Sequence, residues 1–258
     1  MKKVIVFLFV MIGISGCGPS LKEYVAASSH YATRVSATSN ITVNIDNKRG
    51  VRRTDNKVAN VLGSVVNVAT TVGAAALSSE QEQRLYPLIQ PTEMASLVKD
   101  GFEEGFGGAT HLMGVDTTQN PDLRIHLTLD RYGIWAESLL SSMNFYVEAR
   151  IEVIDSASMT TIYTNGVSLM RSASDMVSDI TQSVNAGVQA EVNRAVPRVR
   201  KTRVALDTVH NVGNLVSGAM NLTAFMKLSD EEIQAIFQYM AFDAGVMISD
   251  SLTQAIYQ

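Results

Sequence analysis

The sequence predicts an α+β fold in which a three- to four-stranded antiparallel sheet is packed by helices, with additional helical segments beside it. Residues 123–129 and 143–153 alternate apolar and polar side chains, as strands with one buried face do. Apolar stripes with helical spacing occur before these strands, in residues 93–106, and after them, in residues 230–248. Hydrophobic residues make up 46% of the 258 residues and charged residues 18%, which is enough apolar material for a packed core.

The N-terminus has the pattern of a secretory signal. Lys2 and Lys3 form a positive head, and residues 4–14 form an apolar run. A membrane-spanning helix needs about 20 apolar residues, so this run is too short to span a membrane alone. We therefore expect residues 1–16 to be a signal peptide.

The apolar run ends in Ile14, Ser15, Gly16 and Cys17, and Cys17 is the only cysteine of the chain. This tetrad resembles the lipobox of bacterial lipoproteins. The resemblance implies cleavage before Cys17, diacylation of its thiol, and acylation of the new N-terminus by a chain such as palmitate. More than one acyl chain gives stable membrane attachment. Because Gly18 rather than Asp follows the cysteine, the resemblance further implies an outer-membrane location facing the periplasm.

The mature chain is expected to begin with a lipid-anchored tether, residues 17–40, which contains a short helix over residues 21–27. Residues 41–258 are expected to form a single α+β periplasmic domain. Alternation over residues 41–45 predicts a short strand. Residues 46–57 carry five basic side chains, and we interpret them either as a solvated loop or as a contact with anionic lipid or glycan.

Residues 58–79 contain no charged side chain, and we expect a helical segment at residues 58–77. Val58, Leu62, Val65 and Val66 share one helical face and are candidate interface residues. Two interpretations remain open. The segment is either a buried helix or small-residue hairpin of the fold, or it packs on a membrane or another subunit through its small residues.

The next elements form the centre of the domain. A helix is predicted from Glu93 to about Phe106, and the glycines at positions 105, 107 and 108 are expected to end it. A first strand follows over residues 123–129, residues 132–142 form a connection, and a second strand covers residues 143–153. A third strand is predicted over residues 159–170, with a break near Asn165-Gly166. The residues expected on the buried face are Leu123, Ile125, Leu127, Phe145, Val147 and Ile151.

The C-terminal part of the chain is expected to be mostly helical, with a helical segment at residues 174–226. Ser229 and Glu232 form a capping box, which predicts the start of the last helix. Ile233, Ile236 and Met240 lie on one face of that helix, which we expect to be buried.

No motif in the sequence indicates an enzyme. The four histidines, His30, His111, His126 and His210, lack the spacing of metal ligands, and no nucleophile elbow occurs. We therefore expect no enzymatic activity, no metal and no cofactor. The net charge of -4 argues against a nucleic-acid partner, since such a protein needs a basic surface.

A helix, a three-stranded meander and a further helix look like the small α+β domains of outer-membrane lipoproteins that assist envelope assembly, transport or secretion. This resemblance of layout implies a structural or adaptor component of an envelope complex. Such a protein contacts the membrane through its lipid, and it binds an envelope protein or another copy of itself. The alternative is a carrier of an apolar ligand or lipid, in which some of the 12 methionines would line the site. An envelope hydrolase is the third and weakest interpretation.

Overall fold

The structure is a computed structural model, and it describes residues 20–45, 79–137, 141–175 and 221–258. Residues 79–85 are helical. The other elements are α1 (Leu21–Ala27), β1 (His30–Ala37), β2 (Thr42–Ile45), α3 (Pro91–Ala109), β3 (Met113–Gly114), β4 (Leu123–Ala136), β5 (Met143–Asp155), β6 (Thr160–Ser172), α7 (Leu222–Phe225) and α8 (Asp230–Tyr257). The fold is α+β, as the sequence predicted.

One six-stranded mixed sheet organises the domain. Its order is β3-β1-β4-β5-β6, and β2 pairs with β4 beyond the end of β1. The meander β4-β5-β6 is antiparallel, as expected, whereas β1 and β2 both run parallel to β4 and β3 runs parallel to β1. The predicted sheet of three to four antiparallel strands therefore had too few strands, and it lacked the parallel strands β1, β2 and β3. Side-chain alternation identifies a strand but does not reveal which distant strand it pairs with.

The segment expected as a tether, residues 17–40, contains a central strand. The short helix expected at residues 21–27 is present as α1, where Ser20 and Glu23 form a capping box. The chain then enters β1, which pairs with β4 from Tyr31 to Ala37. Tyr31 and Thr33 are buried, while Arg34 and Ser36 point to the other face and are exposed. The polar and small residues of this strand gave it the composition of a linker.

The meander matches the sequence pattern closely, with differences at its ends. All six side chains expected on the buried face are at most 2% exposed. β4 continues to Ala136 through the stretch expected as a connection, past an irregularity between Leu129 and Arg131. β6 pairs with β5 without interruption at Asn165 and Gly166, where a break was expected, and its irregularity lies instead opposite Val153 and Ile154.

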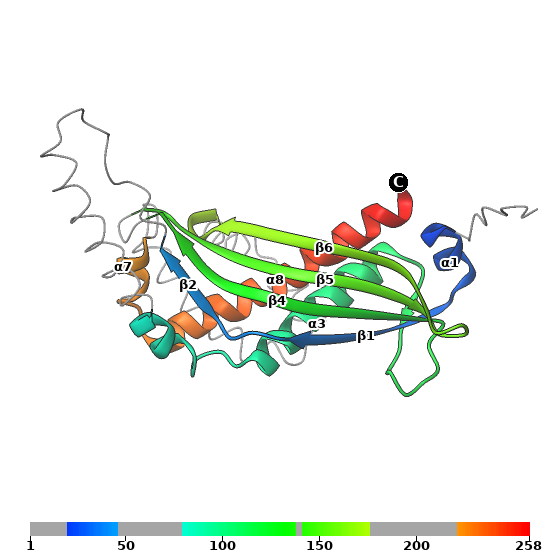
Figure 1. Cartoon of the computed structure of the whole chain (residues 1–258), viewed down its shortest axis with the longest axis horizontal. Coiled ribbons are helices and arrows are strands. Elements are labelled where there is room, and N and C mark those ends of the chain that lie inside the picture. The colour runs from blue at the N-terminus through cyan, green and yellow to red at the C-terminus, as the bar shows by residue number, and fades with distance from the viewer. Residues whose placement is uncertain (1–19, 46–78, 138–140, 176–220) are drawn as a thin grey trace, which may run out of the picture.

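Helices α3 and α8 form a layer against one face of the sheet (Figure 1). Pro91 starts α3, and the helix runs past the three glycines to Ala109, so the expected end near Phe106 was wrong. A Cβ built on Gly101 would lie 2.9 Å from the carbonyl carbon of Phe242, and one on Gly245 would lie 2.7 Å from the backbone nitrogen of Phe102. These two glycines therefore let the backbones of α3 and α8 approach closely. From sequence alone, a glycine that permits such close packing looks the same as a glycine that ends a helix.

The last helix was predicted correctly. Ser229 caps α8 and Glu232 closes the capping box, so that the unpaired N–H groups of the first turn gain acceptors. Ile233, Ile236 and Met240 are buried. The rings of Phe145, Phe225 and Phe237 meet edge to face with centroids 5.6–6.0 Å apart, and so join β5, α7 and α8 in one core.

Candidate functional site

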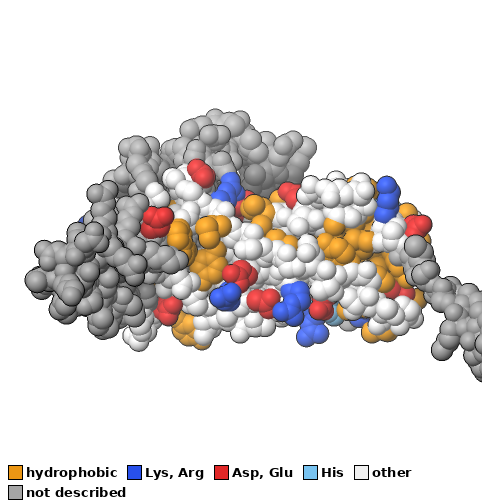
Figure 2. All heavy atoms as spheres, turned by 45° about the horizontal axis from the view of Figure 1, so that its top comes forward, with side chains coloured by type: hydrophobic (Ala, Val, Ile, Leu, Met, Phe, Trp, Pro, Cys, Tyr) orange, Lys and Arg blue, Asp and Glu red, His pale blue; other side chains and the backbone are white. Residues whose placement is uncertain are grey.

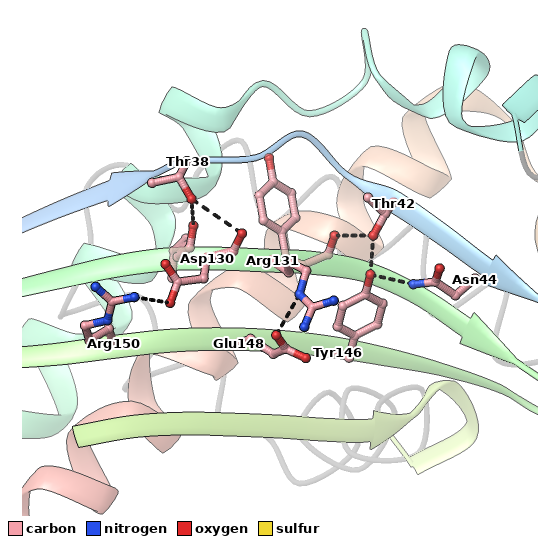
Figure 3. Close-up of polar contacts among 10 residues, drawn as sticks. Thr38, Thr42, Asn44, Asp130, Arg131, Tyr146, Glu148 and Arg150 are labelled. Carbon is pink, nitrogen blue, oxygen red and sulfur yellow. Dashed lines mark hydrogen bonds and ion pairs between the residues drawn. The ribbon is translucent and has the colours of Figure 1, made fainter.

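The face of the sheet opposite the helices is polar, and two ion pairs lie at its centre (Figure 3). Arg131 on β4 bonds Glu148 on β5 at 2.8 Å, and Arg150 contacts Asp130 at 3.4 Å. Exposed ion pairs of this kind contribute little to stability. Their effect here is to leave the centre of this face without a concentrated charge of either sign.

A row of side chains crosses the same face nearer the start of β4. Arg34 on β1 lies beside His126 on β4, and Glu152 on β5 lies on the other side of His126. Burial, followed by the nearby Arg34 guanidinium, lowers the pKa of His126. The alternation of residues 123–129 predicts that His126 lies on the solvent face of its strand, and the structure places it half-buried between the Arg34 guanidinium and the Glu152 carboxylate.

One edge of the sheet is protected. The β3 strand pairs with His30 and Tyr31 at the start of β1. Farther along that edge, the carboxylate of Glu82 accepts a hydrogen bond from the backbone N–H of Val43 at 2.7 Å, which occupies a donor of β2. Short partner strands and inward-pointing charges are devices by which proteins prevent further strands from adding to an edge.

The opposite edge, β6, has no such protection within the described residues. β6 is 13 residues long and pairs only with β5 there. Its stretch from Thr160 to Met170 contains neither proline nor a charged side chain. Figure 2, which turns the β6 side of Figure 1 toward the viewer, shows a broad area of uncharged and hydrophobic atoms beside a row of charged side chains. A long, uncharged edge of this kind is a template for pairing with another strand.

The two faces of β6 differ in character. Tyr163, Val167 and Leu169 point to the helix side, where they are partly buried and pack against the core. On the other face Thr164, Gly166 and Ser168 are exposed, and Met170 is 59% exposed. An added strand would therefore find an apolar margin on one face and a polar margin on the other.

A small hollow lies between β6 and α8. It has a volume of about 20 Å³ and is lined mainly by apolar side chains, among them Leu169, Met240 and Met247. Arg171 forms an ion pair with Asp243 at its margin, which ties the end of β6 to α8. The space has about the size of one water molecule and is far too small for an acyl chain.

A larger, open hollow of about 630 Å³ lies where the end of α3 meets β3 and the loop after it. Burial raises the pKa of Tyr31 there to about 12 and also raises the pKa of Glu103. Lys99 lies 3.6 Å from Glu103, so the two charges largely satisfy each other. The hollow is polar and open to solvent, and its described side chains include no cysteine, serine or histidine.

The residues named from sequence as candidate sites are not tested by these contacts. Cys17 and the helical face of Val58, Leu62, Val65 and Val66 lie outside the described residues, and so does most of the segment 174–226. The β6 edge was not among the candidate sites predicted from the sequence. A usable signal was present, because the last strand of a meander is an edge unless a later strand covers it, and this strand is uncharged up to Met170.

Within the described parts of the chain, no three His, Cys, Asp or Glu side chains gather in a way that would hold a metal ion. None of the helices described here has the length and hydropathy needed to cross a membrane.

Comparison with known proteins gives no family. No family model matches the chain, and no curated protein matches it either. Several solved structures resemble it, among them the following two. A DUF330 protein from Xanthomonas campestris, XCC0632, has a TM-score of 0.41 at 7% identity, with 88% of this chain and 85% of that chain covered. The lipoprotein GNA1162 from Neisseria meningitidis has a TM-score of 0.23 at 12% identity, with 65% of this chain and 99% of that chain covered. A bacterial lipoprotein is thus among the structures that this chain resembles, although similarity at this level carries no inference about function.

Proposed function

We propose that this protein is a lipid-anchored structural or adaptor component of a bacterial envelope complex, held at the outer membrane and facing the periplasm. The lipobox-like tetrad ending in Cys17 supports the anchor. The observation that carries the adaptor role is the long edge of β6, which no described residue covers and which offers backbone hydrogen bonds to a protein partner.

We propose a role in binding rather than in catalysis. Four ionisable side chains at the centre of the polar face form two ion pairs, Arg131–Glu148 and Arg150–Asp130. Lys99 and Glu103 likewise neutralise each other in the open hollow. Ion pairs of this kind are typical of a solvated protein surface. A general acid or base, by contrast, must be able to exchange a proton with a substrate within hydrogen-bond reach.

The carrier alternative receives less support. A lipid carrier needs an enclosed apolar space, since a pocket must bury most of its ligand. The apolar hollow beside Met247 holds about 20 Å³, and the hollow of about 630 Å³ beside Glu103 is open and polar. Among the described methionines, Met94 and Met143 are buried in the core, Met159 and Met170 are exposed, and Met240 and Met247 line only the small hollow.

The anchor is tested by Cys17→Ala in the full chain. Without the thiol no diacylglycerol can attach, so the variant should keep its signal peptide or leave the membrane fraction. Fractionation after a carbonate wash, with mass spectrometry of the product, measures both outcomes. If the variant stays in the membrane with the processed mass of the parent, the lipoprotein assignment is wrong.

The adaptor role is tested by photo-crosslinking in the native envelope. A photoreactive side chain at the exposed position Ser168 on β6 should capture protein, while one at the equally exposed Gln119, in the loop after β3, serves as the matched control. Mass spectrometry identifies the captured chain. Capture that is no stronger at position 168 than at position 119 would remove the support for the adaptor role.

A further inference from the structure

We propose that the partner of the β6 edge is a second copy of this chain. Two β6 strands would pair antiparallel across a two-fold axis, so that two six-stranded sheets become one continuous sheet. This inference rests on the proposed function and specifies its partner.

The backbone provides the first argument. β5 occupies one side of β6, so alternate N–H and C=O groups on its other side have no backbone partner between Thr160 and Met170 in the described structure. At the far edge of the same sheet, β3 pairs with His30 and Tyr31, and the carboxylate of Glu82 accepts a hydrogen bond from the N–H of Val43. Within the described residues, the far edge thus has partial protection, whereas β6 has no partner on its outer side.

Charge provides the second argument. In a two-fold antiparallel pair, each strand faces its own sequence, so any charge near the axis would meet a like charge from the other copy. β6 has no charged side chain from Thr160 to Met170. On the adjacent strand β5, Glu148 and Arg150 are already paired within their own sheet, with Arg131 and Asp130. The strand that would form the new pairing therefore brings no charged side chain to the axis between Thr160 and Met170.

The apolar side chains provide the third argument. Tyr163, Val167 and Leu169 are only partly buried on the helix side of β6. In a two-fold pair centred at Gly166, Leu169 of each copy would lie opposite Tyr163 of the other, and Val167 would lie opposite Asn165. Tyr163 and Leu169 of both copies would then lose contact with water. The exposed side chain of Met247 on α8 borders the same margin, beside Leu169. In this register the apolar Tyr163 and Leu169 face each other on the helix side, and the polar Thr164 and Ser168 face each other on the opposite side.

A lipid anchor would favour this association further. Copies attached to one membrane diffuse in two dimensions with their domains at a similar height, which raises their effective concentration toward one another. A pairing that is weak between chains free in solution then becomes populated at the membrane.

The test uses the full chain in native membranes and a single new cysteine on the exposed face of β6. Gly166→Cys is the central variant, because a Cβ at position 166 meets no atom within 4 Å. Thr164→Cys and Ser168→Cys sample neighbouring registers. Gln119→Cys and the parent chain, whose only cysteine is Cys17, are the controls. A short thiol-reactive crosslinker is added, and dimers are measured by gel mobility and by mass spectrometry of the joined peptides.

We expect a crosslinked dimer in which two copies of the β6 peptide are joined, at least tenfold more abundant for one of the β6 positions than for Gln119→Cys. Adding Thr164→Lys and Ser168→Lys to the Gly166→Cys chain should abolish that dimer, because four ammonium groups would then crowd the axis. Both positions are exposed, so the thermal melting of the lysine variant should match that of its parent. A dimer that persists in this variant would overturn the proposal.

The result also separates this inference from the proposed function. If position 168 captures a different envelope protein and no β6 cysteine yields a dimer, the second copy is excluded as partner while the adaptor role stands. If neither experiment yields a product, both proposals fail. If the cysteine dimer forms with β6 peptides joined, both are supported.

Discussion

Replacing the glycines between α3 and α8 by alanine should reverse the usual effect of that substitution. In a helix interior, Gly→Ala normally stabilises by about 0.5–1 kcal/mol, because alanine loses less backbone entropy on folding. At Gly101 the new Cβ would lie 2.9 Å from the carbonyl carbon of Phe242 and closer still to its oxygen. At Gly245 it would lie 2.7 Å from the nitrogen of Phe102 and closer still to the oxygen of Val98.

The obstructing atoms belong to the backbone, so no side-chain rotation can remove the overlap. The two helices must move apart, and overpacking of this kind costs about 1–3 kcal/mol. Because the overlap is with backbone atoms, we take the upper part of that range, about 2–3 kcal/mol, and subtract a helical gain of about 1 kcal/mol. We therefore expect Gly101→Ala and Gly245→Ala each to lower the free energy of unfolding by roughly 1–2 kcal/mol. For a chain of this size that corresponds to a fall in melting temperature of about 2–8 °C.

Gly108 provides the matched control. It lies in the same helix, and a Cβ there would meet no atom within 4 Å. Gly108→Ala should leave the melting temperature unchanged or raise it by a few degrees, about 4 °C at most. Thermal melting followed by circular dichroism, together with urea denaturation, measures all three variants. If Gly101→Ala and Gly245→Ala raise stability as Gly108→Ala does, the close approach of the two helices is refuted.

Three further predictions concern the sheet. Phe145→Ala should cost about 3–5 kcal/mol in urea denaturation, because it removes a buried ring that contacts Phe225 and Phe237. Glu148→Gln should cost less than about 1 kcal/mol in the same assay, because its ion pair with Arg131 is exposed. Hydrogen bonds from the backbone N–H groups of residues 29 and 30 lower the pKa of Asp122, so its stabilising effect is present above about pH 4 and is lost as the pH falls through the lowered pKa. Melting temperature should therefore fall less between pH 5 and pH 3 for Asp122→Asn than for the parent.

Each of these has an outcome that contradicts it. An unchanged urea midpoint for Phe145→Ala would mean that the ring is not part of a packed core. A cost above about 2 kcal/mol for Glu148→Gln would mean that its ion pair is shielded from water, contrary to its exposed position. Parallel pH profiles for Asp122→Asn and the parent would show that the hydrogen bonds to residues 29 and 30 do not hold the carboxylate in its charged form.

The sequence by itself determined the elements in which local pattern and burial agree. The alternation in residues 123–129 and 143–153 predicted β4 and β5 and all six of the buried side chains named on them. The capping box of Ser229 and Glu232 fixed the start of α8. These features depend on a strand period of two and on the unpaired amides of a helix end, both of which are local. The lipobox-like tetrad at Cys17 is also a local signal, and it remains the basis for the proposed membrane anchor.

Only the tertiary structure decided which distant segments meet. β1 pairs with β4, which lies some 90 residues away in the chain. Because β1 is rich in Ser, Thr and Ala, its composition indicated part of a tether rather than a strand. Gly105, which was expected to help end the helix, lies inside α3, and Ser249 of α8 packs against it. The β6 edge is a candidate site because no described strand covers it, whereas Glu82 and β3 close the other edge. Pairing, close packing and edge exposure are properties of two segments at once, and a pattern read along one segment does not contain them.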